Sequence, residues 1–200
     1  MNPKFHELPQ KTFMNVSKSF KTVGLMLVAA LLMNTTFAQD KTVEVGGAPM
    51  YPSKNIVENA VNSKDHTTLV AAVKAAGLVE TLESTGPFTV FAPTNEAFDL
   101  LPKGTVETLV KPENKAKLTG ILTYHVVAGR LDSRTLAAMI KAGNGTAELT
   151  TVAGGKLWVM KKGHTIMLKD ENGGMATVTI RDVYQSNGVI QVVDHVLLPK

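Results

Sequence analysis

The sequence contains no cysteine among its 200 residues. Disulfide bonds, thiolate nucleophiles, cysteine-based zinc sites and a lipid-modified cysteine are therefore all excluded. A domain without disulfides must be held together by its buried apolar residues, and hydrophobic residues make up 44% of this chain. A chain of this length and composition is large enough to bury a stable core.

Standard catalytic and cofactor-binding signatures are also missing. The sequence has no Gly-x-Ser-x-Gly elbow, phosphate loop, dinucleotide fingerprint or His-Glu-x-x-His motif. Its five histidines show no i,i+4 spacing that would place two metal ligands on one helical face. We therefore predict a protein that is not an enzyme and that has no catalytic residues, bound metal or cofactor.

The first 38 residues have the pattern of a secretory signal peptide. Four lysines precede a short apolar run at residues 23–33, and the small residues Thr36 and Ala38 follow it before the expected cleavage point. The run is too short to favour a spanning helix, and an uncleaved membrane anchor is the alternative interpretation. Met14 offers a second start site with a more usual basic region behind it. We expect an exported protein, periplasmic or extracellular, with no stable membrane span after cleavage.

The chain beyond this leader carries almost no net charge. The whole sequence has 21 basic and 17 acidic residues, and the leader holds four and one of these, which leaves 17 and 16. There is no basic run interleaved with aromatic residues, so nucleic-acid binding is not predicted. Residues 39–54 are polar and contain Gly46-Gly47 and two prolines, which predicts a flexible tether before a single domain at residues 55–200.

The predicted domain changes character halfway along the chain. In its first half, apolar residues recur at helical spacing, and Gly77 and Pro102 supply helix stops. The segment FTVFAP at residues 88–93 predicts a buried strand, followed by Thr94 as a helix N-cap. The second half consists of short β-rich runs separated by Gly-Gly, Lys-Gly and Asn-Gly turns. Helices before strands predict an α+β fold rather than a parallel doubly wound sheet.

The Tyr124-His125 pair lies in the segment ILTYHVVAG, where a helical pattern gives way to β-branched residues. His125 follows Ile121 by four residues and therefore shares its apolar helical face. A histidine in such a place usually pairs its nitrogens with backbone carbonyls or a hydroxyl, because an unpaired buried polar group costs a few kcal/mol. We favour a structural role over the alternatives of an active site or a partner contact.

Other polar or aromatic candidates also have structural interpretations. His66 is expected on the surface at the start of a helix, and His195 is expected to point outward beside the last strand. Asp194 is a candidate general base, although pairing with backbone amides or an arginine is favoured. Trp158 is a candidate for stacking on a sugar, but a single tryptophan in a β-rich run more often packs half-buried.

Three segments of the sequence resemble the fasciclin domain. FTVFAPTNEAFDLLP is similar to its first signature box, ILTYHVVAGRLDS to its Tyr-His segment, and SNGVIQVVDHVLLP to its second box, in the family's order and spacing. The resemblance extends over about residues 55–199. It implies a single domain shaped as a wedge of two small β-sheets flanked by helices, in agreement with the α+β prediction. It also implies a secreted or surface-attached protein of adhesive, non-catalytic function.

The resemblance further implies candidate partner-binding residues. In animal members of the family, integrin contact has been assigned to the Tyr-His segment and to an Asp-Ile pair before the second box. The matching positions here are Tyr124, His125, Asp182 and Val183. The chain departs from the family pattern in three places, with Asn95 where the first box often has Asp, Gln191 where the second often has His, and Ile180-Arg181 in place of Glu-Pro.

Three functions follow as hypotheses from these observations. The leading one is an exported, non-catalytic adhesion or interaction module that binds a protein, matrix or cell-surface partner. The alternative is an envelope protein that binds a small molecule or lipid in a cleft between helices and sheet, for which Met139, Met160, Met167 and Met175 are candidate lining residues. The third, an envelope hydrolase, requires a hydroxyl nucleophile within hydrogen-bond reach of a base such as His125.

Overall fold

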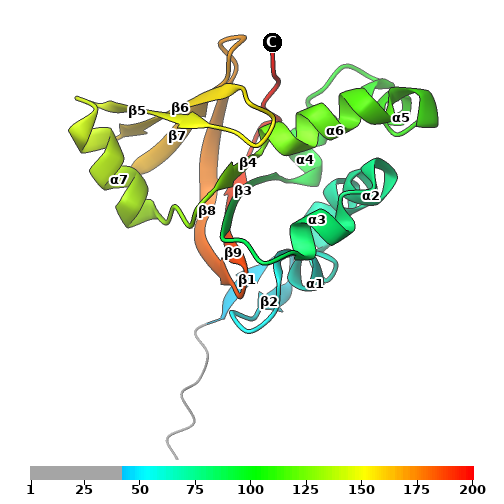
Figure 1. Cartoon of the computed structure of the whole chain (residues 1–200), viewed down its shortest axis with the longest axis horizontal. Coiled ribbons are helices and arrows are strands. Elements are labelled where there is room, and N and C mark those ends of the chain that lie inside the picture. Colours follow the sequence, from blue (N-terminus) through cyan, green and yellow to red (C-terminus); the bar gives the residue numbers. More distant parts are fainter. Residues whose placement is uncertain (1–41) are drawn as a thin grey trace, which may run out of the picture. The chain divides into compact units, whose positions relative to one another are not determined.

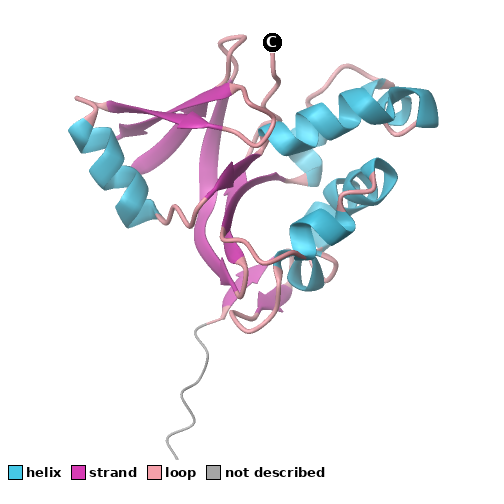
Figure 2. Cartoon of the chain, in the orientation of Figure 1, coloured by secondary structure: helices cyan, strands magenta, loops and turns pink. Residues whose placement is uncertain are grey.

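The computed structural model describes residues 42–200, with most of the helices in the first half and most of the strands in the second (Figure 1). The helices are α1 (Ile56–Ala60), α2 (Thr67–Ala76), α3 (Val79–Glu83), α4 (Asn95–Asp99), α5 (Thr105–Leu109), α6 (Lys115–Tyr124) and α7 (Ser133–Ala142). The strands are β1 (Val43–Val45), β2 (Ala48–Met50), β3 (Phe88–Pro93), β4 (Val126–Ala128), β5 (Thr146–Thr150), β6 (Lys156–Lys162), β7 (Thr165–Lys169), β8 (Met175–Gln185) and β9 (Gly188–Val193). Figure 2 shows α7 on one side of the strands and the other helices on the opposite side. The predicted α+β class is therefore confirmed.

The main sheet has seven strands in the order β4-β3-β9-β8-β7-β6-β5. Strands β3 and β9 run parallel, and every other neighbouring pair is antiparallel. The long strand β8 pairs first with β7 and then with β9, and its pairing with β9 is interrupted by bulges between Val178 and Val183. A bulge bends a strand and increases its twist. The two sheets of the predicted wedge are thus two halves of one strand order that share β8.

The two ends of the seven-stranded order approach each other. Val127 in the edge strand β4 forms an isolated bridge with Thr151, the residue after β5, and Val152 donates its N–H to the Val126 carbonyl at 2.7 Å. These contacts satisfy part of the open edge of β4, which would otherwise present unpaired backbone groups. The second half of the chain therefore curls around its own interior.

Two hydrophobic clusters fill the domain. One lies between the helices α1, α2, α3 and α6 and the strands β3 and β9, and it contains Leu69, Val73, Leu122, Val90 and Ile190. The other lies inside the curled part of the sheet and is covered by α7, which contributes Leu136 and Ile140. The apolar segment at residues 88–93 borders both clusters, with Val90 in the first and Phe91 in the second. Its continuous hydrophobicity follows from this burial on both faces.

The predicted tether at residues 39–54 is wrong from residue 43 onward. Strands β1 and β2 form a hairpin around Gly46-Gly47, whose φ angles of 59° and 74° suit the tight turn between the strands. Val45 and Met50 are buried in the first cluster, and the Gly46 carbonyl accepts a hydrogen bond from Lys64 N–H. The segment VEVGGAPM has the pattern of a short hairpin, but its glycine and proline content favoured the interpretation as a tether. The predicted signal peptide at residues 1–38 lies outside the described residues.

Helix starts agree with the cap residues in the sequence. The Thr94 hydroxyl accepts from the Ala97 N–H at 3.3 Å and caps α4, as predicted. Asp132 caps α7 by accepting from Thr135 N–H at 2.7 Å. Each cap satisfies one of the amide groups that a helix leaves unpaired at its start. Within residues 42–200, no helix combines the length and hydrophobicity that crossing a bilayer requires.

Candidate functional site

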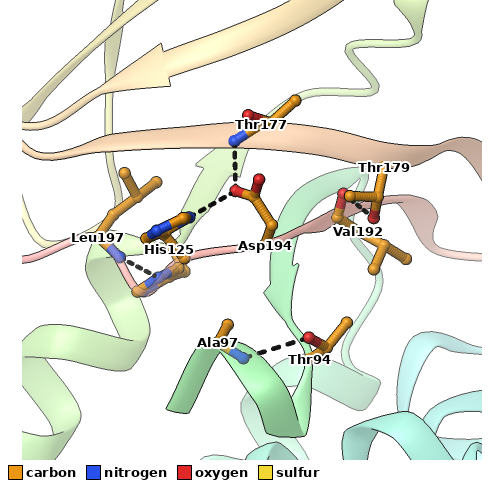
Figure 3. A network of polar contacts seen from close by, with 9 residues as sticks. Thr94, Ala97, His125, Thr177, Thr179, Val192, Asp194 and Leu197 are labelled. Atoms are coloured by element: carbon orange, nitrogen blue, oxygen red, sulfur yellow. Dashed lines mark hydrogen bonds and ion pairs between the residues drawn. The ribbon is translucent and has the colours of Figure 1, made fainter. Parts of the chain in front are cut away.

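His125 lies at the junction between α6 and β4 and is 3% exposed. Its Nδ1 is 2.8 Å from the Ile121 carbonyl, and its Nε2 accepts the Leu197 N–H at 3.0 Å (Figure 3). A carbonyl can only accept and an amide can only donate, so these partners assign the neutral tautomer with the proton on Nδ1. Burial lowers the pKa of His125 to about 4. His125 thus joins the end of α6 to the segment after β9, which is the structural role expected from the sequence.

Tyr124 is fully buried and connects α6 to two other parts of the fold. Its hydroxyl donates to the Lys156 carbonyl at 2.6 Å and accepts from the Glu171 N–H at 3.1 Å. The ring packs on Gly155, where an added Cβ would lie 2.7 Å from a ring carbon. Burial raises the pKa of Tyr124 to about 12. The Tyr-His pair therefore forms part of the interior.

Asp182 occupies the bulged part of β8 with a φ of 60°, in the left-handed region. Its carboxylate accepts from the Ser133 N–H at 2.6 Å and from the Ser133 hydroxyl, at the N-terminus of α7. A carboxylate is favourable there because the helix dipole is positive at its start. Asp182 thereby anchors α7 to the strand, while its neighbour Val183 is 1% exposed and belongs to the first hydrophobic cluster.

Gln191 and Asn95, two of the departures from the family pattern, each use the NH₂ group of the side-chain amide as a donor and its oxygen as an acceptor. The Gln191 side chain donates to the Asp182 carboxylate at 3.1 Å and accepts from the Asp182 N–H at 3.1 Å. The Asn95 side chain donates to the Lys64 carbonyl at 2.8 Å and accepts from the Thr68 N–H at 3.0 Å. An ionised Asp at position 95 would lack the donor. Asn95 therefore connects the start of α4 to the start of α2.

The four predicted partner-binding residues do not form an exposed site. Tyr124, His125 and Val183 are buried, so their side chains cannot contact a partner directly in this structure. Asp182 is half-buried, and its carboxylate is already bound within the protein. The prediction that these four side chains contact a partner, as the matching residues do in animal members, is therefore corrected: they make internal contacts instead. Binding by the surface that they support stays a prediction.

The exposed side chains near Asp182 are Arg130, Arg134, Arg181 and Tyr184, which we call the arginine–tyrosine surface. These three arginines are all the arginines in the sequence. Arg130 lies in the Tyr-His segment, Arg134 directly follows that segment, and Arg181 directly precedes Asp182. Because the other basic residues are lysines, this concentration was a signal that the sequence reasoning missed.

Two members of the arginine–tyrosine surface are held in place by internal hydrogen bonds. Arg130 donates to the carbonyls of Gln185 at 3.1 Å and Ser186 at 3.2 Å. The Tyr184 hydroxyl donates to the Asp132 carboxylate at 3.2 Å, and Tyr184 is 39% exposed. Hydrogen bonds from Thr135, together with the nearby charge of Arg134, lower the pKa of Asp132. Arg130 and Tyr184 are thus held in defined positions on this surface.

His66 is buried at 4% exposure, so the predicted surface position is wrong. A 3₁₀ turn at Lys64–His66 directs the ring inward before α2 begins, and its Nδ1 lies 2.9 Å from the Ser63 hydroxyl. Its Nε2 has no hydrogen-bond partner among residues 42–200. Burial lowers the pKa of His66, although the nearby Ala92 carbonyl opposes this shift.

The remaining predicted positions agree with the structure. Asp194 accepts from the Thr177 N–H at 2.6 Å (Figure 3), and its carboxylate lies 2.8 Å from Nδ1 of the exposed His195. The expected pairing of Asp194 with a backbone amide is therefore confirmed. Trp158 is half-buried on β6, as expected for packing.

The geometry does not assemble a hydrolytic centre at His125, because both ring nitrogens are bonded to the backbone. Ser63 and His66 form a hydroxyl–imidazole pair, but both are buried and no carboxylate among residues 42–200 orients the second ring nitrogen. Residues 42–200 also contain no group of three His, Asp or Glu side chains placed to hold a metal ion.

Comparisons with known proteins identify relatives of this chain. A family model described as the fasciclin domain matches residues 64–199, more than half of the sequence. Protein sll1483 of Synechocystis sp. is 46% identical over 177 residues, which are 88% of this chain and 89% of that protein. Transforming growth factor-beta-induced protein ig-h3 of Sus scrofa is 34% identical over 148 residues, which are 74% of this chain and 20% of that protein.

A solved structure supports the same assignment. It is described as a FAS1 domain pair from the insect cell adhesion molecule fasciclin I, and it matches with a TM-score of 0.52 at 26% identity. The match covers 65% of this chain and 43% of the solved chain, so this protein spans less than half of that pair. The matched residues include the Tyr-His segment and both signature boxes. This chain belongs to the fasciclin domain family.

Proposed function

We propose that this protein is an exported, non-catalytic adhesion or interaction module that binds a protein, matrix or cell-surface partner. Its family and its likeness to a domain pair from an insect cell adhesion molecule support this function. The leader pattern at residues 1–38 supports export to the periplasm or the cell exterior. The observation that carries the proposal is the arginine–tyrosine surface.

The chemistry of this surface suits recognition of another macromolecule. Arginine and tyrosine are enriched at protein interfaces, where a few such residues supply most of the binding energy. Arg130 and Tyr184 are held by internal hydrogen bonds, so less side-chain freedom is lost when a partner binds. The nearby Asp132 and Asp182 carboxylates accept hydrogen bonds inside the domain. The three arginines of the surface outnumber these two carboxylates, so the net charge of the surface is positive, and the partner surface should be rich in carboxylates.

The test uses substitutions of exposed residues that leave the interior intact. Purified protein is immobilised, and capture of host cells and of host matrix fractions is compared between the natural protein and the variants Arg134→Ala and Tyr184→Ala. Each variant should weaken capture about tenfold or more, as expected for residues at the centre of an interface. Lys141→Ala, an exposed change in the last turn of α7, is the matched control and should capture normally. Full capture by both folded surface variants would refute this assignment.

Substitutions of Tyr124 or Asp182 are less informative for adhesion. Tyr124 joins α6 to β6, and Asp182 anchors α7, so either change would weaken the fold itself. A loss of binding in these variants would not separate a contact from a folding defect. Arg134 and Tyr184 avoid this ambiguity because both are exposed.

A second candidate function, binding of a small molecule or lipid, is favoured by one observation. The structure contains an apolar cavity between the helices and the sheet. The four methionines predicted to line such a cleft do not line this cavity, although Met50 does. Met139 instead packs against the second hydrophobic cluster, and Met175 is exposed. The cavity supports this second function, but the methionines predicted to line a cleft are not its lining residues.

A further inference from the structure

The apolar cavity lies among α1, α2, α3, the end of α6 and the strands β3 and β9. Its volume is about 90 Å³, several times the roughly 10–15 Å³ that one water molecule requires. The wall is almost entirely hydrocarbon and is contributed by residues such as Ile56, Leu69, Val73, Leu82, Phe88 and Ile190. Water needs two to four polar partners to occupy such a space. The cavity is therefore suited to an apolar guest.

The residues at the mouth of the cavity are more exposed to solvent than those in its interior. Val70, Val79 and Thr81 line it but are half-buried or exposed, and Val152 on the other side is 49% exposed. Interior lining residues such as Ile56 and Leu69 are buried, with exposures of 3% and 9%. The cavity thus reaches solvent where α2 and α3 face the loop after β5.

Lys74 is the charged residue that lines this mouth. It lies one helical turn after Val70 on the same face of α2, and its side chain is exposed. Among residues 42–200, Lys74 forms no ion pair with Asp or Glu. A single cation beside a hydrocarbon cavity is complementary to a ligand with one anionic end and a long apolar tail.

We propose that this cavity binds the hydrocarbon chain of a fatty acid whose carboxylate lies at the mouth beside Lys74. This proposal rests on the second candidate function and names its ligand class, and it is independent of adhesion by the arginine–tyrosine surface. Burial of the chain in the cavity drives binding, because apolar surface leaves water. The carboxylate stays at the solvent boundary, where its charge is not desolvated and Lys74 attracts it.

Binding is measured by titrating the purified protein with dodecanoate, below its micelle concentration, in an isothermal calorimeter. The expected result is saturable binding of one dodecanoate per chain. Dodecanol, which has the same chain without the charge, should bind about two- to fivefold more weakly, as expected for the loss of one exposed ion pair. Equal affinity for dodecanol would overturn the assignment of the carboxylate but leave the cavity function standing, whereas saturable binding of neither compound would overturn both.

Paired variants locate the site. Val70→Trp fills the cavity from α2 and should weaken dodecanoate binding at least tenfold, whereas Ala71→Trp, on the exposed face of the same helix, should not. Lys74→Met keeps the length of the side chain but removes the charge, and it should lower the affinity for dodecanoate and not for dodecanol. Lys141→Met is its control on α7. Unchanged dodecanoate binding by folded Val70→Trp protein would overturn the proposal.

Methyl NMR of the natural protein gives an answer even if a variant does not fold. Dodecanoate should shift the methyl signals of Val70, Val79 and Val152 at the mouth, and of Leu69 in the interior. The methyl signal of the exposed Met175 on β8 should not move. Shifts confined to residues outside the cavity would contradict the proposed site.

Discussion

Acidification should destabilise this domain through His125, whose neutral form alone fits its hydrogen bonds. Nε2 accepts the Leu197 N–H at 3.0 Å, so a proton on Nε2 would replace that bond with two opposed donors. The ring is also buried, and a buried imidazolium loses its hydration. In the unfolded chain the same ring is hydrated and takes up its proton at the ordinary value.

The sign and size follow from the two pKa values. The pKa of His125 is about 4 in the folded protein, against 6.5 for an unperturbed histidine. The unfolded state therefore binds more protons between these values, and the stability that is present above pH 6.5 is lost as the pH falls toward 4. The free energy of unfolding falls by about 2 kcal/mol between pH 7 and pH 5. It falls by about 3 kcal/mol in total once the pH is below both pKa values. Most carboxylates remain ionised above pH 5, which leaves this window to the histidines.

The assay is urea unfolding at pH 7, 6 and 5, followed by the fluorescence of Trp158, the one tryptophan in the sequence. The His66 pKa is also lowered by burial, so His66 contributes with the same sign and the natural protein reports both rings. His125→Asn retains a donor for the Ile121 carbonyl and removes the titrating group. It should be about 2–4 kcal/mol less stable at pH 7, with a shallower dependence on pH.

His164→Gln is the matched control, because His164 is exposed in the turn between β6 and β7. This variant should keep the pH dependence of the natural protein to within about 0.5 kcal/mol. An NMR titration of the His125 ring in natural protein provides an independent check. A midpoint near 6.5, or an unchanged pH dependence in His125→Asn, would refute the reasoning from burial and tautomer.

Three further substitutions test structural roles by urea unfolding. Tyr124→Phe leaves the Lys156 carbonyl and an amide without their partner and should cost about 1–3 kcal/mol, whereas Tyr184→Phe, an exposed control, should cost less than about 0.5 kcal/mol. Met50→Ala should cost about 2–4 kcal/mol because Met50 is 3% exposed, and a negligible effect would restore the tether interpretation of residues 39–54. Asp182→Ala should cost about 2–3 kcal/mol, from the left-handed backbone and the loss of the acceptor for the Ser133 N–H at the start of α7; a stable variant would contradict the anchoring role.

Much of the fold could be predicted from local patterns in the sequence. The segment at residues 88–93 was expected as a buried strand because it lacks alternation, and Thr94 was expected as a cap. The hairpin at β1 and β2 was missed because each strand has three residues. So short a segment carries too little periodicity to outweigh its glycine and proline content. Its order comes from the burial of Val45 and Met50 against residues distant in the sequence.

The site was only partly predictable for a related reason. Helical spacing placed His125 on an apolar face, which was sufficient to expect an internal role. The spacing could not reveal that Leu197, 72 residues away, supplies its second partner. The His66 ring likewise points inward because of a 3₁₀ turn, and no pattern in the sequence predicts that turn. Long-range contacts decide burial, and they arise only once the fold brings the segments together.

Burial also separates two roles that the family resemblance combines. A fully buried side chain makes the same internal contacts whichever molecule is bound outside, so Tyr124, His125 and Val183 cannot discriminate between partners. What they can do is fix the positions of α6 and β8. Discrimination must come from exposed groups, which near Asp182 include Tyr184 on β8 and Arg134 on α7, the helix that Asp182 anchors to β8. On this reasoning, two fasciclin domains with the same Tyr-His segment can bind different partners, because affinity differences reside in exposed side chains.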